Sequence, residues 1–267
     1  MKEKKQIKFS IIIPNYNKEA YIKDTLNSIF EQTYKNIEVI VIDDGSSDNS
    51  LDIIKDYDVK LLHTNRKRAG GARNKGLDNA SGDYILFLDS DDYFTNNTVI
   101  EKLANHINNE DIIFLSFTRD KFGNVYDIIE DNDDINNKIE NTKYLGCPTK
   151  CFKKSLLDGI RFPEGKRFED IIFTLEAMCK AKDYSYFNES FFTYRSVPNS
   201  NVTTEISGDT MIDILEELIK IYRLCIKYPK YKINLLNRLK NDKLNIRLDI
   251  LNHLIEFDEN KFLDYFN

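Results

Sequence analysis

The chain has 267 residues, of which 41% are hydrophobic and 31% are charged, and its net charge is −6. This length and apolar content are enough to bury one large core, or one core with a small appendage, and they exclude a chain that is mainly disordered. The acidic balance excludes a nucleic-acid coat protein, which needs a basic excess to neutralise phosphates.

The N-terminal region contains no segment that is apolar enough for a signal peptide or a membrane span. Its longest apolar run covers only residues 9–13 and is interrupted by Ser10. We therefore expect a cytoplasmic protein. The four cysteines show no paired CxxC spacing and no neighbouring histidine, so we expect reduced, packed thiols. They are Cys147, Cys151, Cys179 and Cys225.

Short β-branched runs alternate with longer amphipathic segments up to residue 118, a pattern typical of a parallel sheet covered by helices. The predicted strands are 9–13, 38–42, 59–62, 84–88 and 112–117. The predicted helices are 19–32, 48–56, 71–79 and 98–108, with Asn17, Ser47 and Asn97 as N-caps. The fold class is therefore α/β, with a mostly parallel central sheet flanked by helices.

The second half of the chain has a weaker pattern. Residues 118–146 are polar and predict a hairpin followed by a mobile loop. Residues 168–180 have helical spacing, and 184–187 with 191–195 predict a second hairpin. From residue 209 the chain is predicted to be helical, with a break at Pro229.

Three loops follow predicted strands of the sheet, and in open α/β sheets ligands bind at this edge. These loops are 14–17, 43–48 and 89–92, and the last two are acidic. Asp89, Asp91 and Asp92 offer the hard oxygen ligands that suit Mg²⁺ or Mn²⁺ bound together with substrate phosphates. The alternative is that these acids are solvated or cap the next helix.

Arg73 favours the metal and diphosphate interpretation. It follows Gly70-Gly71 near the start of a predicted helix, where a helix N-terminus and a guanidinium can both face a phosphate. Tyr16 offers a flat ring for stacking and Asp44 an acceptor for a base or ribose, although alone each is typical of packing or of a turn. The helix dipole favours the pair Glu169-Asp170 at a helix start whatever its function.

Taken together, these motifs resemble glycosyltransferase family 2, the inverting enzymes of the GT-A fold. The similar segments occur in order at 9–17, 40–48, 72–77, 80–84, 89–92 and 169–170. The resemblance implies a GT-A (Rossmann-like) catalytic domain over residues 1–204. Its nucleotide-binding half would be 1–118 and its acceptor-binding half 119–204, followed by a C-terminal helical region at 205–267.

The resemblance also implies a role for each matched residue. Its nucleotide-binding set is Pro14, Tyr16, Glu19, Asp44, Arg73 and Asp89. Within this set Pro14, Tyr16 and Asp44 would hold the base, and Arg73 would lie near the phosphates. Asp91 would be the direct ligand of Mn²⁺ or Mg²⁺, and Asp89 would contact the ribose or a metal-bound water.

The general base implied by the resemblance is Asp170. Glu169, Lys150 and Arg195 are assigned to the acceptor or phosphate side. The chain departs from the family pattern near the last two residues. Thr149 precedes Lys150 where an aromatic residue is frequent, and the stretch beginning at Val197 lacks the usual histidine.

The implied reaction moves a sugar from a nucleoside-diphosphate sugar, with inversion, to a hydroxyl of a glycan or polyprenyl-diphosphate-linked acceptor. The expected donor is a UDP-hexose or UDP-N-acetylhexosamine, and the expected pathway is cell-surface polysaccharide synthesis, such as capsule or lipopolysaccharide. Two alternatives stay open. One is a metal-dependent sugar nucleotidyltransferase or phosphotransferase, although no Gly-rich loop follows the first strand. The other is an inactive nucleotide-sugar-binding module.

The C-terminal region carries a charge asymmetry. Residues 220–247 contain nine lysines and arginines and one acid, Asp242, hence a net charge of +8. Basic residues interleaved with Leu and Ile favour peripheral docking to the anionic inner face of the cell membrane. A solvated helical face or a homodimer surface would carry the same pattern.

Overall fold

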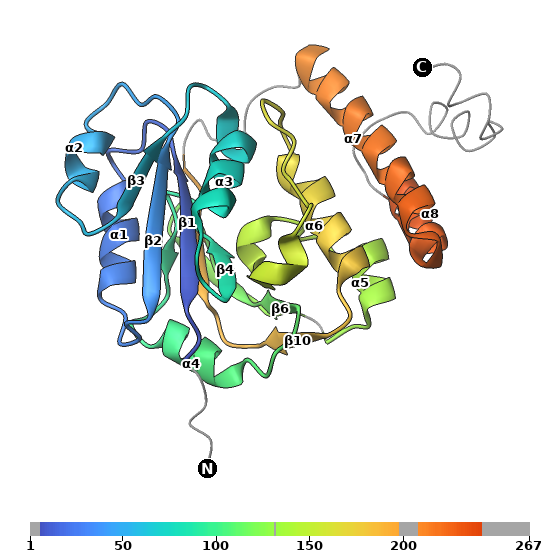
Figure 1. Cartoon of the computed structure of the whole chain (residues 1–267), viewed down its shortest axis with the longest axis horizontal. Coiled ribbons are helices and arrows are strands. Elements are labelled where there is room, and N and C mark those ends of the chain that lie inside the picture. The colour runs from blue at the N-terminus through green and yellow to red at the C-terminus, as the bar shows by residue number, and fades with distance from the viewer. Residues whose placement is uncertain (1–5, 131, 198–207, 242–267) are drawn as a thin grey trace.

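A seven-stranded sheet forms the centre of the structure, a computed structural model that describes residues 6–130, 132–197 and 208–241 (Figure 1). The spatial order of its strands is β10-β6-β9-β4-β1-β2-β3, and only β9 runs antiparallel to its neighbours. In that order the strands are Tyr184–Phe187, Ile112–Leu115, Lys150–Lys153, Tyr84–Phe87, Phe9–Asn15, Ile37–Asp43 and Lys60–His63.

Helices cover both faces of this sheet. They are α1 (Ile22–Phe30), α2 (Ser50–Ile54), α3 (Arg68–Asn79), α4 (Val99–His106), α5 (Ile135–Asn141), α6 (Glu169–Lys180), α7 (Gly208–Lys227) and α8 (Lys232–Asn241). The side chains of Ile11 and Ile13 lie in a core with α1 and α4, whereas Ile12 lies in a second core with α3 and α6. Successive strand residues face opposite sides, so a continuous run of isoleucines fills both cores.

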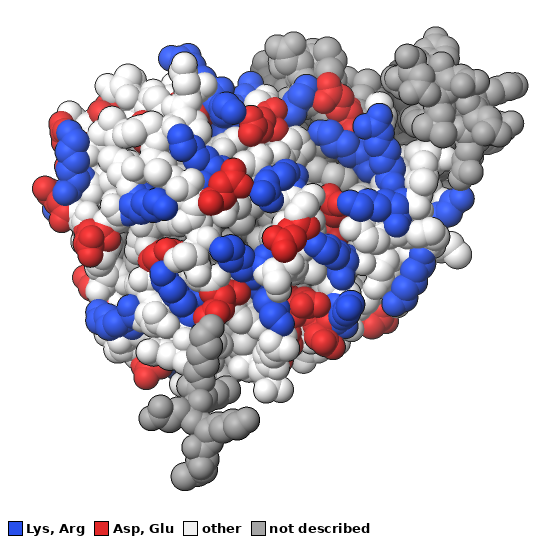
Figure 2. Space-filling model, viewed as in Figure 1, with Lys and Arg blue, Asp and Glu red and all other residues white. Residues whose placement is uncertain are grey.

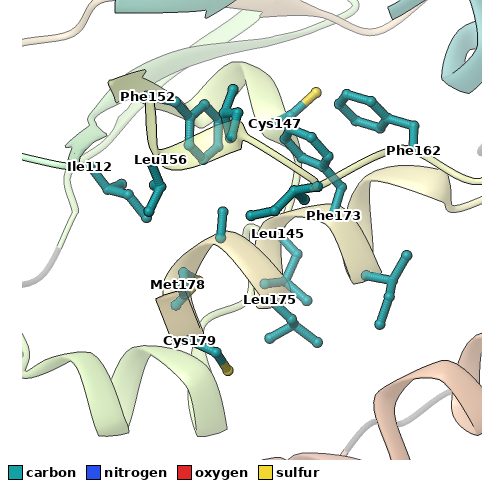
Figure 3. Close-up of a cluster of buried hydrophobic side chains, with 14 of the residues drawn as sticks. Ile112, Leu145, Cys147, Phe152, Leu156, Phe162, Phe173, Leu175, Met178 and Cys179 are labelled. Atoms are coloured by element: carbon teal, nitrogen blue, oxygen red, sulfur yellow. The ribbon is translucent and has the colours of Figure 1, made fainter. Parts of the chain in front are cut away.

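Aromatic rings fill the second core beneath α6. The rings of Phe162 and Phe173 stack with centroids 3.7 Å apart, and Phe152 meets Phe173 edge to face at 5.7 Å (Figure 3). Such ring pairs contribute beyond the apolar area they bury, at about 0.5–1.5 kcal/mol each. This packing holds α6 against β9 of the central sheet.

A four-stranded sheet lies beside the central one. Its order is β5-β11-β7-β8, with bounds Tyr93–Phe94, Phe192–Arg195, Phe117–Lys121 and Asn124–Ile128. Short 3-10 turns occur at Cys147–Thr149, Lys154–Leu157 and Pro229–Tyr231. Strands from both predicted halves of the catalytic domain share the central sheet, so the boundary at residue 118 does not separate two sheets.

Most predicted elements are confirmed, with ends that shift by up to three residues. The predicted strand 112–117 divides at Ser116 into β6 and β7. The predicted N-caps are wrong. The helices begin after Tyr21, Asn49 and Thr98 without side-chain caps. Asn17 instead accepts a hydrogen bond from the Ser47 backbone through its Oδ1, at 2.8 Å.

Two predictions for the second half need correction. The hairpin at 118–146 is confirmed as β7–β8, but the predicted mobile loop contains α5, whose N-cap Asp134 accepts from the Asn136 and Asn137 backbones. The second predicted hairpin is wrong, because β10 joins the central sheet and β11 joins the smaller one. The backbone of Ser116 forms hydrogen bonds with both Phe187 and Phe191. The β6–β7 and β10–β11 segments therefore pass from one sheet to the other side by side.

The C-terminal helices extend the layer of α5 and α6. Helix α7 packs against α6, and α8 packs against α5 and α7. The predicted break at Pro229 is confirmed as a short turn between α7 and α8. Within the described part of the chain, no helix is long and apolar enough to cross a membrane.

Candidate active site

Side-chain bonds join the three loops at the carboxyl edge of the central sheet. The Asn15 side chain at the end of β1 donates to Asp43 Oδ1 at 2.9 Å. Lys18 Nζ reaches Asp91 Oδ2 at 2.5 Å, so the first loop also contacts the acidic loop after β4. The predicted convergence of these loops is therefore confirmed.

Arg73 of α3 is buried between two carboxylates. Its Nη1 donates to Glu169 Oε1 at 2.6 Å and its Nη2 to Asp89 Oδ1 at 2.7 Å. Gly70 lies one turn earlier, and a Cβ there would come within 2.3 Å of the Pro163 carbonyl and 3.1 Å of Glu169 Cγ. Glycine at position 70 therefore lets α3 approach the start of α6.

Asp170 occupies the first turn of α6 next to this network. A Cβ on Gly146 would lie 3.5 Å from Asp170 Oδ2, an ordinary contact distance, so the turn at Gly146 lies directly against this carboxylate. Burial, with a further contribution from the Glu169 charge, raises the pKa of Asp170 to about 6, while Arg73 opposes the rise. The residue before the helix, Phe168, has φ 58°, which is unusual for a bulky residue. Residues with such strained backbone conformations occur frequently at functional sites.

The acidic loop after β4 suits a cation. Burial raises the pKa of Asp91, although the ammonium of Lys18 opposes this. Asp92 is buried, and its Oδ2 has no hydrogen-bond partner among the described residues. Burial and the charges of Asp89 and Asp91 raise its pKa well above the usual range.

A divalent cation fits this donor set only in part. The carboxylates of Asp89 and Asp91 are the right ligand type, and Lys18 marks a position that attracts positive charge. No three acidic, histidine or cysteine side chains of the described residues converge on one point. A bound cation would therefore take its remaining ligands from substrate phosphates and water.

The residues predicted to hold the nucleotide lie around the first two loops. Pro14 is half-buried in β1, and Tyr16 beyond it is 45% exposed. Asp44 accepts hydrogen bonds from Thr64 Oγ1 and from the backbones of Lys67 and Arg68, at 2.7–2.8 Å. Asp44 thus holds the start of α3, and its role in base binding stays a prediction.

Three other predicted residues make structural contacts. The carboxylate of Glu19 accepts from the backbone and side chain of Asn49 and ties the first loop to α2. Arg73 pairs with carboxylates, as described above, so its nearness to phosphates stays a prediction. Glu169 is the partner of Arg73 and belongs to the same network as Asp89.

Lys150 and Arg195 make internal contacts, and their assignment to the acceptor or phosphate side stays a prediction. Lys150 is fully buried, its Nζ donates to the Tyr144 carbonyl at 2.6 Å, and burial lowers its pKa to about 8. It therefore supports the turn that carries Gly146. The guanidinium of Arg195 pairs with Asp24 at 3.2 Å and lies over the rings of Tyr21 and Tyr93.

Lys18 and Asn15 are site residues that sequence reasoning missed. Asn15 belongs to the loop 14–17 and Lys18 follows it directly, but nothing in their spacing predicts which distant carboxylate each side chain contacts. Only the folded geometry brings Lys18 to Asp91 across 73 positions of sequence.

Comparison with known proteins gives a consistent result. The family model described as glycosyl transferase family 2 matches residues 10–158. GlyG of Streptococcus pneumoniae is 29% identical over 94% of this chain and 92% of its own length. GlyA of the same organism is 31% identical over 80% of this chain, which spans only about a third of that relative (34%). Both relatives are named as glycosyltransferases.

The fold also matches a solved structure. Residues 1–349 of Staphylococcus aureus TarS, crystallised with UDP-GlcNAc, superpose with a TM-score of 0.71 at 26% identity. The match covers 87% of this chain and 72% of that one. TarS is named as a poly(ribitol-phosphate) β-N-acetylglucosaminyltransferase.

Proposed function

Because the chain belongs to glycosyltransferase family 2, we propose that it transfers a sugar from a nucleoside-diphosphate sugar to a hydroxyl of a glycan or lipid-linked acceptor. The TarS complex with UDP-GlcNAc supports a UDP-sugar, a hexose or N-acetylhexosamine, as the donor. The names of relatives such as TarS support a place in cell-surface polysaccharide synthesis. The observation that carries the proposal is the position of Asp170 on the first turn of α6, directly after Glu169, whose carboxylate Arg73 joins to Asp89 of the acidic loop.

Asp170 acts as the general base in this proposal. With a pKa of about 6 it is mostly ionised at neutral pH, yet it is more basic than an ordinary aspartate. It takes the proton of the acceptor hydroxyl while that oxygen bonds to the anomeric carbon. The bond from this carbon to the diphosphate breaks in the same step, the nucleoside diphosphate leaves, and the configuration inverts.

Glu169 supports this step without taking the proton. Adjacent helical residues point about 100° apart, so the two carboxylates cannot face one acceptor equally. The carboxylate of Glu169 is held by Arg73, which also holds Asp89. Asp170 is then the carboxylate of the pair that remains available to the acceptor.

Mn²⁺ or Mg²⁺, held by Asp91 and Asp89, would neutralise the charge that grows on the leaving diphosphate. The described residues contribute the carboxylates and a local cation, Lys18, that balances Asp91. Tyr16 and Pro14 border the neighbouring loop, where we propose that the nucleoside base binds with the help of Asp44.

The basic C-terminal segment docks to an anionic membrane in this proposal, which keeps the enzyme at the cytoplasmic face. In Figure 2, Lys and Arg side chains lie among Asp and Glu side chains on the right of the molecule, where Figure 1 shows α6 to α8. Within the basic segment, Lys227 pairs with Glu176 of α6. Part of the segment lies outside the described residues. Vesicle binding and solution mass distinguish membrane docking from a homodimer surface.

A donor screen tests the proposed function. The full chain is incubated with individual nucleotide sugars and Mn²⁺, and nucleoside diphosphate release is measured. We expect slow hydrolysis of one UDP-sugar that an acceptor accelerates. A nucleotidyltransferase would instead form pyrophosphate from a nucleoside triphosphate, and an inactive binding module would bind UDP without releasing product. Either result would contradict the proposal.

A further inference from the structure

One face of the four-stranded sheet carries two rows of side chains that are direct cross-strand neighbours. The inner row is Phe192, Phe117 and Ile128. The rings of Phe192 and Phe117 stack with centroids 5.3 Å apart. The outer row, two residues along each strand, is Tyr194, Arg119 and Tyr126. An arginine therefore lies between two tyrosines on the same face.

Arg119 is the one charged member of the outer row. Its guanidinium carbon lies 5.4 Å from the centre of the Tyr194 ring. Its Nε is buried without a hydrogen-bond partner, and no described carboxylate forms an ion pair with the guanidinium. A half-buried guanidinium that lacks a carboxylate favours an external anion, and its planar donors match phosphate oxygens.

The outer row borders the site described above. The backbone of Arg195, next to Tyr194 on β11, donates to Asp92 Oδ1 at 2.9 Å, so this end of the outer row lies beside the acidic loop. On the inner row, the ring of Tyr144 meets Phe117 edge to face at 5.2 Å. The Tyr144 carbonyl accepts from Lys150 and begins the turn that brings Gly146 to Asp170. The sheet therefore borders the acidic loop, and the segment from Tyr144 to Gly146 connects its buried inner row to Asp170.

The hairpin beyond Arg119 ends in an exposed apolar tip. Phe122 and Gly123 form its two-residue turn with φ of 53° and 86°, where Asn-Gly or Gly-Gly is the usual choice. A bulky aromatic residue in the left-handed region costs conformational energy, yet Phe122 is 69% exposed. Val125, Tyr126 and Ile129 of the same hairpin are also exposed. Along β7, Arg119 is followed by Asp120 and Lys121, and the exposed apolar tip at Phe122 comes next.

We propose that the β7–β8 hairpin binds the acceptor, and that this acceptor is a glycolipid whose sugar is joined to an apolar chain through phosphate. This inference rests on the proposed function and deepens it. The sugar hydroxyl faces Asp170, the guanidinium of Arg119 binds the phosphate between the tyrosine rings, and the apolar chain lies along the tip at Phe122. Charge-assisted bonds from arginine to phosphate supply both affinity and orientation.

Acceptor binding to the full chain, saturated with UDP and Mn²⁺, tests this assignment. The three probes are an N-acetylglucosaminyl diphosphate with a short isoprenyl chain, the same sugar diphosphate with a methyl group, and a neutral methyl glycoside. The variants are Arg119→Gln, Arg119→Lys and Phe122→Ser. The control is Arg161→Gln, which removes an exposed arginine paired with Asp78.

We expect Arg119→Gln to weaken both diphosphate probes about 10- to 100-fold, the range expected for losing charged hydrogen bonds, while UDP and the neutral glycoside bind unchanged. Arg119→Lys should restore part of the loss. Phe122→Ser should weaken only the isoprenyl probe, and the control should match the wild type.

Three results would overturn the inference. The first is Arg119→Gln binding the diphosphates as tightly as the wild type. The second is an equal loss for the neutral glycoside, which would indicate a structural role. The third is that the Arg119 and Phe122 variants bind the probes as the wild type does but no longer bind anionic phospholipid vesicles that lack the glycolipid. That result would indicate a membrane contact instead. A wild type that binds no UDP and releases none would contradict the proposed function itself, and the acceptor assignment with it.

Discussion

Arg73 donates through Nη1 to Glu169 at 2.6 Å, which links helix α3 to the first turn of α6 across 96 positions of sequence. The same guanidinium holds Asp89 of the acidic loop. The proposed base, Asp170, is the next residue on α6. Burial raises the pKa of the base most, and the charges of Glu169, Arg73 and Asp89, a proposed nucleotide-binding residue, shift it further.

Substitutions at the two ends of this contact should move the pKa of Asp170 in opposite directions. Arg73 lowers that pKa and Glu169 raises it. The base must be ionised, so wild-type kcat/KM should fall as the pH falls through about 6. Arg73→Gln should shift this acid limb to higher pH and Glu169→Gln to lower pH. Shifts in the same direction would contradict the network.

Removing the proposed metal ligand should abolish the cation dependence of nucleotide binding. Asp91→Ala leaves a loop that contributes little to the core, so the unfolding midpoint should change little. Lys18→Met removes the ammonium that competes for Asp91 and should tighten Mn²⁺ binding. Calorimetry with UDP, with and without Mn²⁺, measures both effects. Unchanged affinity in Asp91→Ala would place the cation elsewhere.

Substitutions of the two proposed base-binding residues, Tyr16 and Asp44, should differ in their effect on the free energy of unfolding. Tyr16 is exposed, so Tyr16→Ala should weaken UDP binding without changing the free energy of unfolding. Asp44→Ala should also lower the free energy of unfolding by about 1–3 kcal/mol, because it leaves donors of Thr64, Lys67 and Arg68 without their acceptor. UDP titration and urea unfolding test this. If both variants bind UDP as tightly as the wild type, the base lies elsewhere.

The buried lysine should give the protein a distinctive alkaline stability profile. The pKa of Lys150 is about 8 in the folded chain and near its ordinary value of 10.5 when unfolded. Between these two values the unfolded chain binds more protons, so Lys150 makes the free energy of unfolding rise with pH. In Lys150→Met this contribution should disappear. Urea unfolding of the wild type and Lys150→Met at several pH values above 7 measures this difference. If the free energies of unfolding of both proteins change with pH in parallel, the predicted contribution of Lys150 is wrong.

Local patterns were enough to predict the sheet of the N-terminal half. The isoleucines of β1 and the acidic loop after β4 carry strong signals of burial and of a polar edge. The later hairpin prediction failed because local pairing of 184–187 with 191–195 competes with longer-range pairing to β6 and β7. Helix α5 was missed because it buries only one apolar side chain, Ile139, and because Lys138 forms a buried pair with Glu130 that a polar sequence conceals.

The candidate site likewise contains residues that the sequence predicts and residues whose positions depend on the fold. Motif positions predicted Asp89, Asp91, Glu169 and Asp170 at one edge, and the joined loops confirm that the three loops meet there. The placement of Lys150 could not be predicted, since burial of a lysine depends on carbonyls that only the folded turn supplies.

The most direct test of the account is the rate of sugar transfer by Asp170→Asn compared with Glu169→Gln, using one donor and one acceptor. The amide keeps the size of the side chain but cannot take the acceptor proton. Asp170→Asn should therefore lower kcat by about 10²–10⁴-fold with donor affinity unchanged, and Glu169→Gln should lower it less. Larger damage in Glu169→Gln would contradict the assignment of the base. Equal rates in both variants and the wild type would contradict the proposed mechanism.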